Sequence, residues 1–253
     1  MYHQNTVSDV RHEFAEMLLA GEFGQDKSGG LTLEMVGATF VADDETLFGK
    51  VNHDYVAREI AWYESTSRNV NDIPGETPII WQQVADDSGV INSNYGWCIF
   101  TKENGEQYAN VLAELTNNGE STRRGQMIYT RPSMWKDYNE NGRSDFICTD
   151  SVQYFIRRGE LIAHVRMRSN DAWAGYRNDF AWQKHVRDRL LLDLNRAGKK
   201  VEVGRIIWTA GSLHIYDRQF YLVYHYIATG ETHISKKEYA ERYASDVEGR
   251  RYI

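Results

Sequence analysis

A long helical run between two strand-like runs is the feature that most constrains the fold of this chain. Residues 161–168 alternate apolar and polar side chains, which is the period of a strand with one buried face. Residues 178–197 carry apolar side chains at helical spacing, and Gly198 follows as a stop signal. Another strand-like run covers 205–208. Strands interleaved with helices indicate a single α/β or α+β domain.

The rest of the chain continues this alternation. Thr6 and Asp9 have the spacing of a capping box, and the helical pattern that follows them ends at Gly21. Further helices are expected at about 55–65 and 106–115. Other strands are expected at 31–35, 152–156 and 220–225, which gives a sheet of about five or six strands.

The composition excludes several classes of protein. The chain has 253 residues and only two cysteines, so we expect no disulfide framework and a reducing compartment. Aromatic residues make up 13% of it, which argues against disorder, and the formal net charge of −7 argues against general nucleic-acid binding. No apolar run approaches the roughly 20 residues that span a bilayer. The first ten residues do not have the pattern of a signal peptide, so we expect a soluble intracellular protein.

Two patterns that could bind a metal are incomplete. Residues 137–142 match the start of a calcium loop, yet the position that should carry a bidentate Glu is Cys148. Cys98 and Cys148 lack the Cys-x-x-Cys spacing of a zinc site. The sequence therefore predicts a polar turn at 137–142 and no metal.

Cys148 is the better candidate of the two cysteines for a reactive thiol. A single cysteine is most often a small buried apolar residue, and that interpretation stays open for both. Polar side chains follow Cys148 at Asp150 and Ser151, and three basic residues share one face of the expected strand at 161–168. Nearby positive charge lowers the pKa of a thiol.

Several charged residues have both a functional and a structural interpretation. Arg123, Arg124 and Arg168 could clamp a phosphate, with Ser169 beside the last of them, because guanidinium groups match phosphate oxygens. They could equally be solvated surface charges. Asp179 could simply cap the long helix.

Three further residues also have both a functional and a structural interpretation. Glu59 lies in an apolar stretch of a predicted helix, where it is either an exposed residue or a buried acid. His214 and Tyr216 are two residues apart in a strand-like run and so share a face, which is a weak indication of a binding site.

Taken in order along the chain, these residues resemble the thymidylate synthase family. The similar motifs run nearly end to end: Lys27-Ser28-Gly29, Glu59 to Trp62, Ile80-Trp81, Asn94-Tyr95-Gly96, Thr122-Arg123-Arg124, Cys148 with Gln153, Arg168 to Asp171, Gly175 to Asp179, and Trp208 to Tyr216. Within that family, three segments resemble the hydroxymethylase branch of T-even-type bacteriophages, which acts on deoxycytidylate: 72–78, 129–134 and 232–237.

The resemblance implies a fold, a reaction and partners. It implies a thymidylate synthase-like α/β (α+β) fold with a large mixed sheet flanked by helices, in one domain over residues 1–253, and a homodimer formed through the sheet face. It implies 5,10-methylenetetrahydrofolate as the co-substrate, no metal, and transfer of one carbon to C5 of a pyrimidine nucleotide, here dCMP. It also implies that the enzyme acts in the cytoplasm of an infected bacterium, with a nucleotide-synthesis complex as a further possible partner.

The resemblance also implies a role for each matching residue. Cys148 corresponds to the nucleophile that adds to C6 of the pyrimidine. Glu59 and Tyr95 correspond to groups that organise water and proton transfer. The remaining correspondences are to phosphate contacts at Lys27, Arg168 and Ser169, phosphate contacts from the partner subunit at Arg123 and Arg124, a substrate contact at Asn170, contacts to the sugar 3′-hydroxyl at His214 and Tyr216, and folate contacts at Trp81, Asp171 and Gly175.

Asp179 is the informative departure from the synthases, which carry Asn at this position. Hydrogen-bond counting alone does not exclude Asn with cytosine, because an amide can flip. The catalytic argument is stronger: an acid can protonate N3 of cytosine as charge develops there, while its other oxygen accepts from N4. Such an acid needs a pKa raised by burial. We therefore interpret Asp179 as the determinant of cytosine.

The fate of the transferred carbon separates the remaining alternatives. Addition of water gives a hydroxymethyl product and leaves tetrahydrofolate, whereas hydride from the folate gives a methyl product. No single residue decides this, and Glu59 is the candidate that holds the water. The alternatives are a methylating synthase on dUMP or dCMP, and a non-catalytic nucleotide- or RNA-binding scaffold. The intact set of Cys148, Arg168, Asp179 and His214 argues against a scaffold.

Overall fold

The computed structural model describes residues 4–252, which form two compact units. Unit 1 contains the chain up to Val51, Ser169–Ala181, and the chain from Ile207 onward. Unit 2 contains Asn52–Arg168 and Trp182–Ile206. The prediction of one domain over the whole chain stays a prediction.

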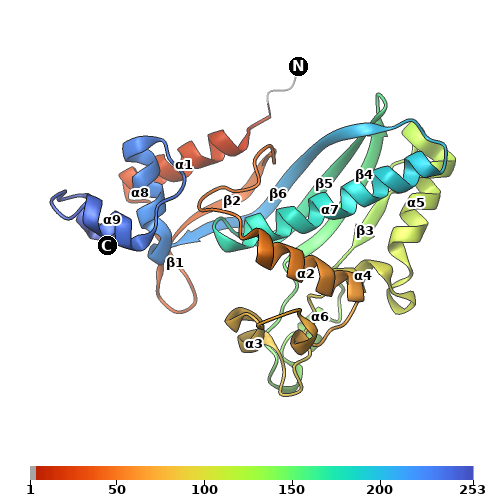
Figure 1. Cartoon of the computed structure of the whole chain (residues 1–253), viewed down its shortest axis with the longest axis horizontal. Coiled ribbons are helices and arrows are strands. Elements are labelled where there is room, and N and C mark those ends of the chain that lie inside the picture. The colour runs from red at the N-terminus through yellow and green to blue at the C-terminus, as the bar shows by residue number, and fades with distance from the viewer. Residues whose placement is uncertain (1–3, 253) are drawn as a thin grey trace. The chain divides into compact units, whose positions relative to one another are not determined.

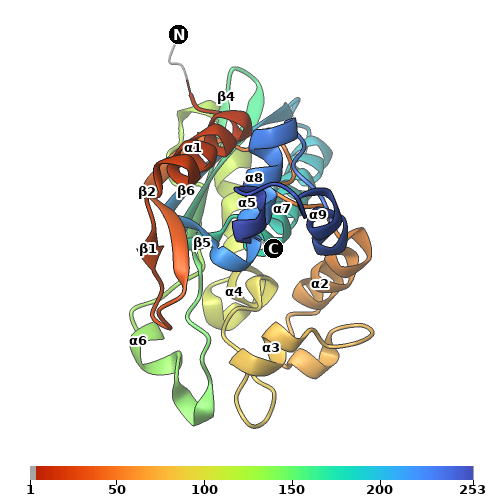
Figure 2. The ribbon, with the colours of Figure 1, turned by 90° about the vertical axis from the view of Figure 1, so that its left-hand side faces the viewer.

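Unit 1 is built on two helices that cover a strand hairpin. Its complete elements are α1 (Val7–Ala20), β1 (Gly24–Gln25), β2 (Leu31–Val41), α8 (Phe220–Thr229) and α9 (Lys236–Arg242). The predicted capping box is confirmed, because Thr6 and Asp9 each accept from the other's backbone N–H and Gly21 ends α1 in the left-handed region at φ 70°. Helices α1 and α8 pack together (Figure 1), and Figure 2 shows β1 beside β2.

Unit 2 contains most of the short helices. Its complete elements are α2 (His53–Ser65), α3 (Ile79–Val84), α4 (Tyr95–Phe100), α5 (Gln107–Asn118), β3 (Gln126–Ile128), α6 (Met134–Asp137) and β4 (Thr149–Arg157). Three longer elements contribute residues to both units: β5 (Glu160–Asp171), α7 (Ala174–Arg196) and β6 (Glu202–Tyr216). Within unit 2, α5 packs on β3, and α4 packs on both α2 and α5.

The described strands form a six-stranded mixed sheet in the order β1-β2-β6-β5-β4-β3. The pairs β1–β2, β2–β6, β3–β4 and β4–β5 are antiparallel. Strands β5 and β6 run parallel, because Gly204 lies against the backbone of Leu161 and, farther along both strands, Ala172 N–H donates to His214 O at 2.7 Å. The α/β fold with a mixed sheet flanked by helices is therefore confirmed.

The alternation that predicted the central strands is confirmed by burial. Leu161, Ala163, Val165 and Met167 are buried on one face of β5, while His164, Arg166 and Arg168 lie on the other. On β4 the residues Val152, Tyr154 and Ile156 are buried in the same way. This buried face is the core of the sheet, and it fixes which side chains point away from that core.

The sequence-based prediction is wrong about the type of one element and about the start of another. The run at 220–225 is not a strand but the first part of α8, a helix whose residues Phe220 to Val223 are all buried. A helical turn that is buried on every side has no helical period in its hydrophobicity, and the β-prone aromatic residues of this first turn imitate a strand. The long helix α7 begins at Ala174 rather than Asn178, so Asp179 lies inside it and is not its N-cap.

No helix among residues 4–252 is long and apolar enough to span a membrane. No group of three or more possible metal-ligating side chains occurs among these residues either.

Candidate active site

Cys148 lies immediately before β4, next to an arginine of the neighbouring strand. Arg168 N–H donates to Cys148 O at 2.9 Å, and Arg168 Nη2 lies 3.6 Å from Cys148 Sγ. The same guanidinium donates to Ile147 O at 2.9 Å and to Phe146 O at 2.6 Å. A cation held this close to sulfur favours the thiolate, which is the nucleophilic form. The predicted association of Cys148 with a basic residue is therefore present within unit 2.

Cys98 provides the contrast expected of a structural thiol. Its side chain is buried on α4, and burial raises its pKa to about 12. Such a thiol stays protonated at neutral pH, so Cys148 is the cysteine with a nucleophile's surroundings.

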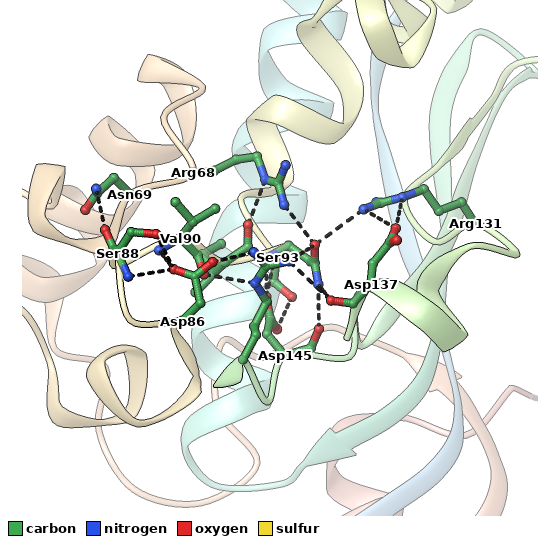
Figure 3. A network of polar contacts seen from close by, with 12 residues as sticks. Arg68, Asn69, Asp86, Ser88, Val90, Ser93, Arg131, Asp137 and Asp145 are labelled. Atoms are coloured by element: carbon green, nitrogen blue, oxygen red, sulfur yellow. Dashed lines mark hydrogen bonds and ion pairs between the residues drawn. The ribbon is translucent and has the colours of Figure 1, made fainter. Parts of the chain in front are cut away.

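Arginine side chains hold the loop that leads to Tyr95, and Figure 3 shows two of them, Arg68 and Arg131. The buried side-chain oxygen of Asn92 accepts from Arg68 at 2.9 Å, from Arg143 at 3.2 Å and from Arg131 at 3.4 Å. Its amide group donates to Asp137 O at 3.1 Å. Because Asn92 is fully buried, every one of these bonds replaces water that the side chain has lost.

The same network reaches the chain that leads to Cys148. Asp145 accepts from the backbone N–H of Asn92 at 2.6 Å, and from the N–H and hydroxyl of Ser93 at 2.7 and 2.6 Å (Figure 3). Asp145 is three residues before Cys148, and Ser93 is two residues before Tyr95. The two segments that carry these candidate residues are thus tied together inside unit 2.

Glu59 is a buried acid, not an exposed helix residue. On α2 it is 5% exposed, and its Oε1 accepts from Tyr55 Oη at 2.5 Å and from Trp81 Nε1 at 3.2 Å. Burial raises the pKa of Glu59 to about 7, although both hydrogen bonds act to lower it. A carboxyl that titrates near neutral pH is suited to general acid–base work.

Tyr95 is buried at the first position of α4, behind the N-cap Asn94. A Cβ on Gly96 would lie 1.8 Å from Tyr63 O, so this close helix contact requires glycine. The ring of Tyr95 lies 5.3 Å from the ring of Tyr129 in an edge-on contact. The Asn94-Tyr95-Gly96 motif is therefore explained in part by packing.

Arg123 and Arg124 lie between α5 and β3 with exposed side chains. Arg124 Nη2 is 3.1 Å from Glu114 Oε1, with the arginine side chain 77% exposed. Arg124 and Glu114 also line a surface depression, together with Gln107, Asn110, Val111 and Gln126. Both guanidinium groups are thus accessible, as a contact to a second subunit would require.

In unit 1, Asp179 is held by an amide. Asn170 Nδ2 donates to Asp179 Oδ2 at 2.8 Å, and Trp208 Nε1 donates to Asn170 Oδ1 at 3.2 Å. The substrate contact predicted for Asn170 stays a prediction, but this buried side chain clearly orients Asp179. Ser169, beside it on β5, is half-buried.

The start of α7 is organised by Asp171. Its two oxygens accept from Trp173 N–H at 3.0 Å and from Ala174 N–H at 3.1 Å, which is why α7 begins four residues earlier than its apolar pattern indicated. A Cβ on Gly175 would lie 3.3 Å from Asn170 and Asp171, so this turn is close-packed. The predicted folate contacts Asp171 and Gly175 thus lie together.

The remaining predicted residues of unit 1 lie on its strands and hairpin. His214 Nε2 is 3.2 Å from Tyr216 Oη on the same face of β6, as predicted, and His214 Nδ1 is 3.2 Å from Ser212 Oγ. Lys27 lies in the β1–β2 turn, which Asp26 closes by accepting from Ser28 and Gly30. Turn residues on a rigid strand pair are well placed to contact a ligand.

Sequence comparison identifies the family of this chain. The model of the family described as thymidylate synthase matches residues 13–248. The chain belongs to the thymidylate synthase family. It is 54% identical over 241 residues to the deoxycytidylate 5-hydroxymethyltransferase of Enterobacteria phage T4, covering 94% of this chain and 98% of that protein. The enzyme of the same name from Enterobacteria phage T6 is 54% identical over 236 residues, covering 92% and 96%.

Members that make thymidylate are more distant from this chain. Thymidylate synthase 1 of Bacillus subtilis (strain 168) is 29% identical over 177 residues, covering 67% of this chain and 59% of that protein. Among solved structures, the thermostable thymidylate synthase A of Bacillus subtilis matches with a TM-score of 0.64 at 21% identity, covering 86% and 83% of the two chains. At that identity the match supports the fold alone.

Residue patterns missed two parts of the site. Tyr55 contacts Glu59 directly, and its place one helical turn before Glu59 was a signal that could have identified it. The side chains around Asn92 and Asp145 come from segments about 50 residues apart, and no local pattern indicates such a network.

Proposed function

We propose that this family member transfers a hydroxymethyl group to C5 of dCMP, using 5,10-methylenetetrahydrofolate and water. The observation that carries the proposal is 54% identity over nearly the whole chain to phage deoxycytidylate 5-hydroxymethyltransferases, joined with Asp179 where the synthases carry Asn. The enzyme would act in the cytoplasm of an infected bacterium and supply modified cytosine for phage DNA.

The first chemical step belongs to Cys148. C5 of cytosine is a poor nucleophile, and addition of the thiolate to C6 converts the ring into an enamine whose C5 can attack. Arg168 supports the thiolate from 3.6 Å and offers its outer face to the nucleotide phosphate, with Lys27 and Ser169. Asp179 protonates N3 as charge develops there and accepts from the N4 amino group.

The folate supplies the carbon, and the protein positions it. Trp81, Asp171 and Gly175 are the residues that would hold the folate. Their surroundings fit a bound ring system, because Trp81 is fixed through Nε1 and the Asp171–Gly175 turn is close-packed. After tetrahydrofolate leaves, water must reach the carbon on C5. Glu59, half-ionised near neutral pH, is the group that would hold this water and accept its proton.

Product analysis tests the proposed function. The protein is incubated with dCMP and methylenetetrahydrofolate, the nucleotide is identified by mass, and dihydrofolate is followed by its absorbance. Hydroxymethyl-dCMP without dihydrofolate is expected. A methyl product with dihydrofolate would instead identify a synthase, and nucleotide binding without turnover would identify a scaffold.

We also propose a homodimer in which Arg123 and Arg124 contact the phosphate bound by the partner subunit. Their exposed guanidinium groups support this arrangement.

Cys148→Ser should lower turnover by on the order of 10⁴-fold because the nucleophile is lost, and the variant should still bind dCMP. Mixing Cys148→Ser with Arg124→Glu subunits should restore activity, because one site of each heterodimer is then intact. No gain over either parent would refute shared sites.

A further inference from the structure

The side chains of Tyr55, Trp81 and Glu59 form a closed set of hydrogen bonds. Tyr55 lies one turn before Glu59 on α2, and its hydroxyl donates to Glu59 Oε1 at 2.5 Å. Trp81 Nε1 from α3 lies 2.9 Å from Tyr55 Oη and 3.2 Å from Glu59 Oε1. The indole therefore divides its one N–H between the phenol and the carboxyl, and the phenol gives its only proton to the carboxyl.

We propose that Tyr55 is a positioning residue for the hydroxymethyl transfer: its hydroxyl holds Glu59 and Trp81 in register and favours the ionised form of Glu59. The inference rests on the proposed function in one respect, namely that Glu59 acts in the reaction. Tyr55 itself needs no contact with the nucleotide or the folate.

The charge on Glu59 depends on neutral donors. Burial raises the pKa of Glu59 to about 7, and the hydrogen bonds from Tyr55 and Trp81 are the influences that lower it. Burial, and then the neighbouring Glu59, raise the pKa of Tyr55 far above its usual range, so the phenol remains a donor at every working pH.

Arg58, the cation nearest in sequence to Glu59, lies over the ring of Tyr55, with its Cζ 5.6 Å from the ring centroid, and its hydrogen bonds go to other groups. Arg58 donates to Asp54 at 3.1 Å and to the carbonyls of Pro74 and Glu76 at 3.1 and 2.9 Å. Helix α3 has no titratable side chain between Ile79 and Val84, and α4 has only Tyr95 and Cys98. Helix α7 brings His185 and Arg189 to α2, where they contact Glu64 at 2.8 and 2.7 Å.

Removing the Tyr55 hydroxyl alone should therefore move the titration of Glu59. In Tyr55→Phe the carboxylate loses its shortest hydrogen bond, and a bond to a charged group is typically worth about one unit of pKa or somewhat more. The midpoint should rise by about one unit, from about 7 in the unaltered protein. With Glu59 half-ionised at pH 7 before the change and roughly a tenth afterwards, kcat at pH 7 should fall about five-fold.

The experiment follows the Trp81 indole N–H in protein labelled with ¹⁵N-tryptophan, over pH 5.5 to 9, without substrate. Its signal is assigned with Trp81→Phe, and Glu59→Gln should abolish its titration. Tyr154→Phe is the control, because it removes a tyrosine hydroxyl of the same unit that is fully buried and has no hydrogen-bond partner. The titration midpoint of Tyr154→Phe should equal that of the unaltered protein. The midpoint of Tyr55→Phe should lie about one pH unit higher.

A midpoint in Tyr55→Phe equal to that of the unaltered protein overturns the proposal, as does the absence of any Glu59-dependent titration. If Tyr55→Phe does not fold, 3-fluorotyrosine incorporated at position 55 keeps the hydroxyl as a stronger donor and should move the midpoint down. If Tyr55 had only a structural role, this substitution would leave the titration midpoint of Glu59 unchanged.

A parallel measurement of kcat and KM separates the two proposals. We expect the Tyr55→Phe deficit to be in kcat, to disappear by about pH 9, and to leave KM for dCMP within about two-fold. Because the indole titration needs no turnover, it tests Tyr55 even if the product proves to be a methylated nucleotide. A hydroxymethyl product with an unmoved midpoint refutes the role of Tyr55 and leaves the proposed function intact.

Discussion

Glu59 and Asp86 are buried acids of unit 2 that lie in opposite electrostatic surroundings. Burial would raise the pKa of Asp86, but the Val90 N–H, the Arg143 guanidinium and Ser88 together lower it to about 2. Glu59 has two neutral donors, and its pKa rises to about 7. A buried acid beside a cation is fixed as an anion and serves structure. One held by neutral donors can exchange a proton near neutral pH and can serve catalysis.

The largest effect on stability is expected from breaking the Asp86–Arg143 pair. The two groups are 2.6 Å apart with side chains 3% and 6% exposed, so Arg143→Met leaves a buried carboxylate without its cation. We expect a loss of about 3–5 kcal/mol in the free energy of unfolding, measured by urea denaturation at pH 7.

The exposed pair Lys184–Asp188 offers a matched control for this change. Its side chains are 53% and 41% exposed, and Lys184→Met should cost less than about 1 kcal/mol. If the two variants lose the same free energy of unfolding, burial does not determine how much these ion pairs contribute to stability.

Glu59→Gln should remove a pH dependence of stability. The folded pKa of Glu59, about 7, lies above its ordinary value of 4.5, so the folded state binds the proton more tightly than the unfolded state. This stabilisation is complete below pH 4.5 and is lost as the pH rises through 7. The unaltered protein should lose about 3 kcal/mol more than Glu59→Gln between these limits, measured by urea denaturation at pH 4.5 and 8. Parallel curves for the two proteins would contradict the raised pKa.

Asp179 in unit 1 accepts a hydrogen bond from the neutral amide of Asn170. If this acid recognises cytosine, Asp179→Asn should lower the ratio of kcat/KM for dCMP to that for dUMP by about 100-fold. This corresponds to ~2.7 kcal/mol of discrimination between the two substrates. Asp188→Asn, an exposed acid on the same helix, should leave the ratio unchanged. An unchanged ratio in Asp179→Asn would remove this residue from the choice of base.

The smallest effect is expected at Asp145, which lies between the two classes. Burial raises its pKa even though Ser93 and two backbone N–H groups donate to it, and Arg143 acts from nearby. In Asp145→Asn the remaining oxygen can still accept from the backbone, and the Ser93 hydroxyl can rotate to accept from the new amide. We expect a loss of about 1 kcal/mol in the free energy of unfolding. A loss as large as that of Arg143→Met would place Asp145 among the cation-held acids.

Local patterns predicted the parts of the fold that depend on near neighbours in sequence. The capping box at Thr6 and Asp9 was confirmed, because its donors and acceptors lie three residues apart. The alternation along β5 was confirmed because a strand places every second side chain on one face. The helical start at Ala174 was missed, since the capping Asp171 precedes the apolar pattern.

For the candidate site, the sequence by itself determined which residues are present and in what order. Motif order singled out Cys148, Glu59 and Asp179, and it placed the chain in its family. Their surroundings were decided by tertiary structure. Whether Glu59 is exposed or buried, and whether the Trp81 indole reaches it, depends on α3 packing beside α2. The charge of an acid is set by the groups within a few ångströms, and folding brings those groups from distant parts of the chain.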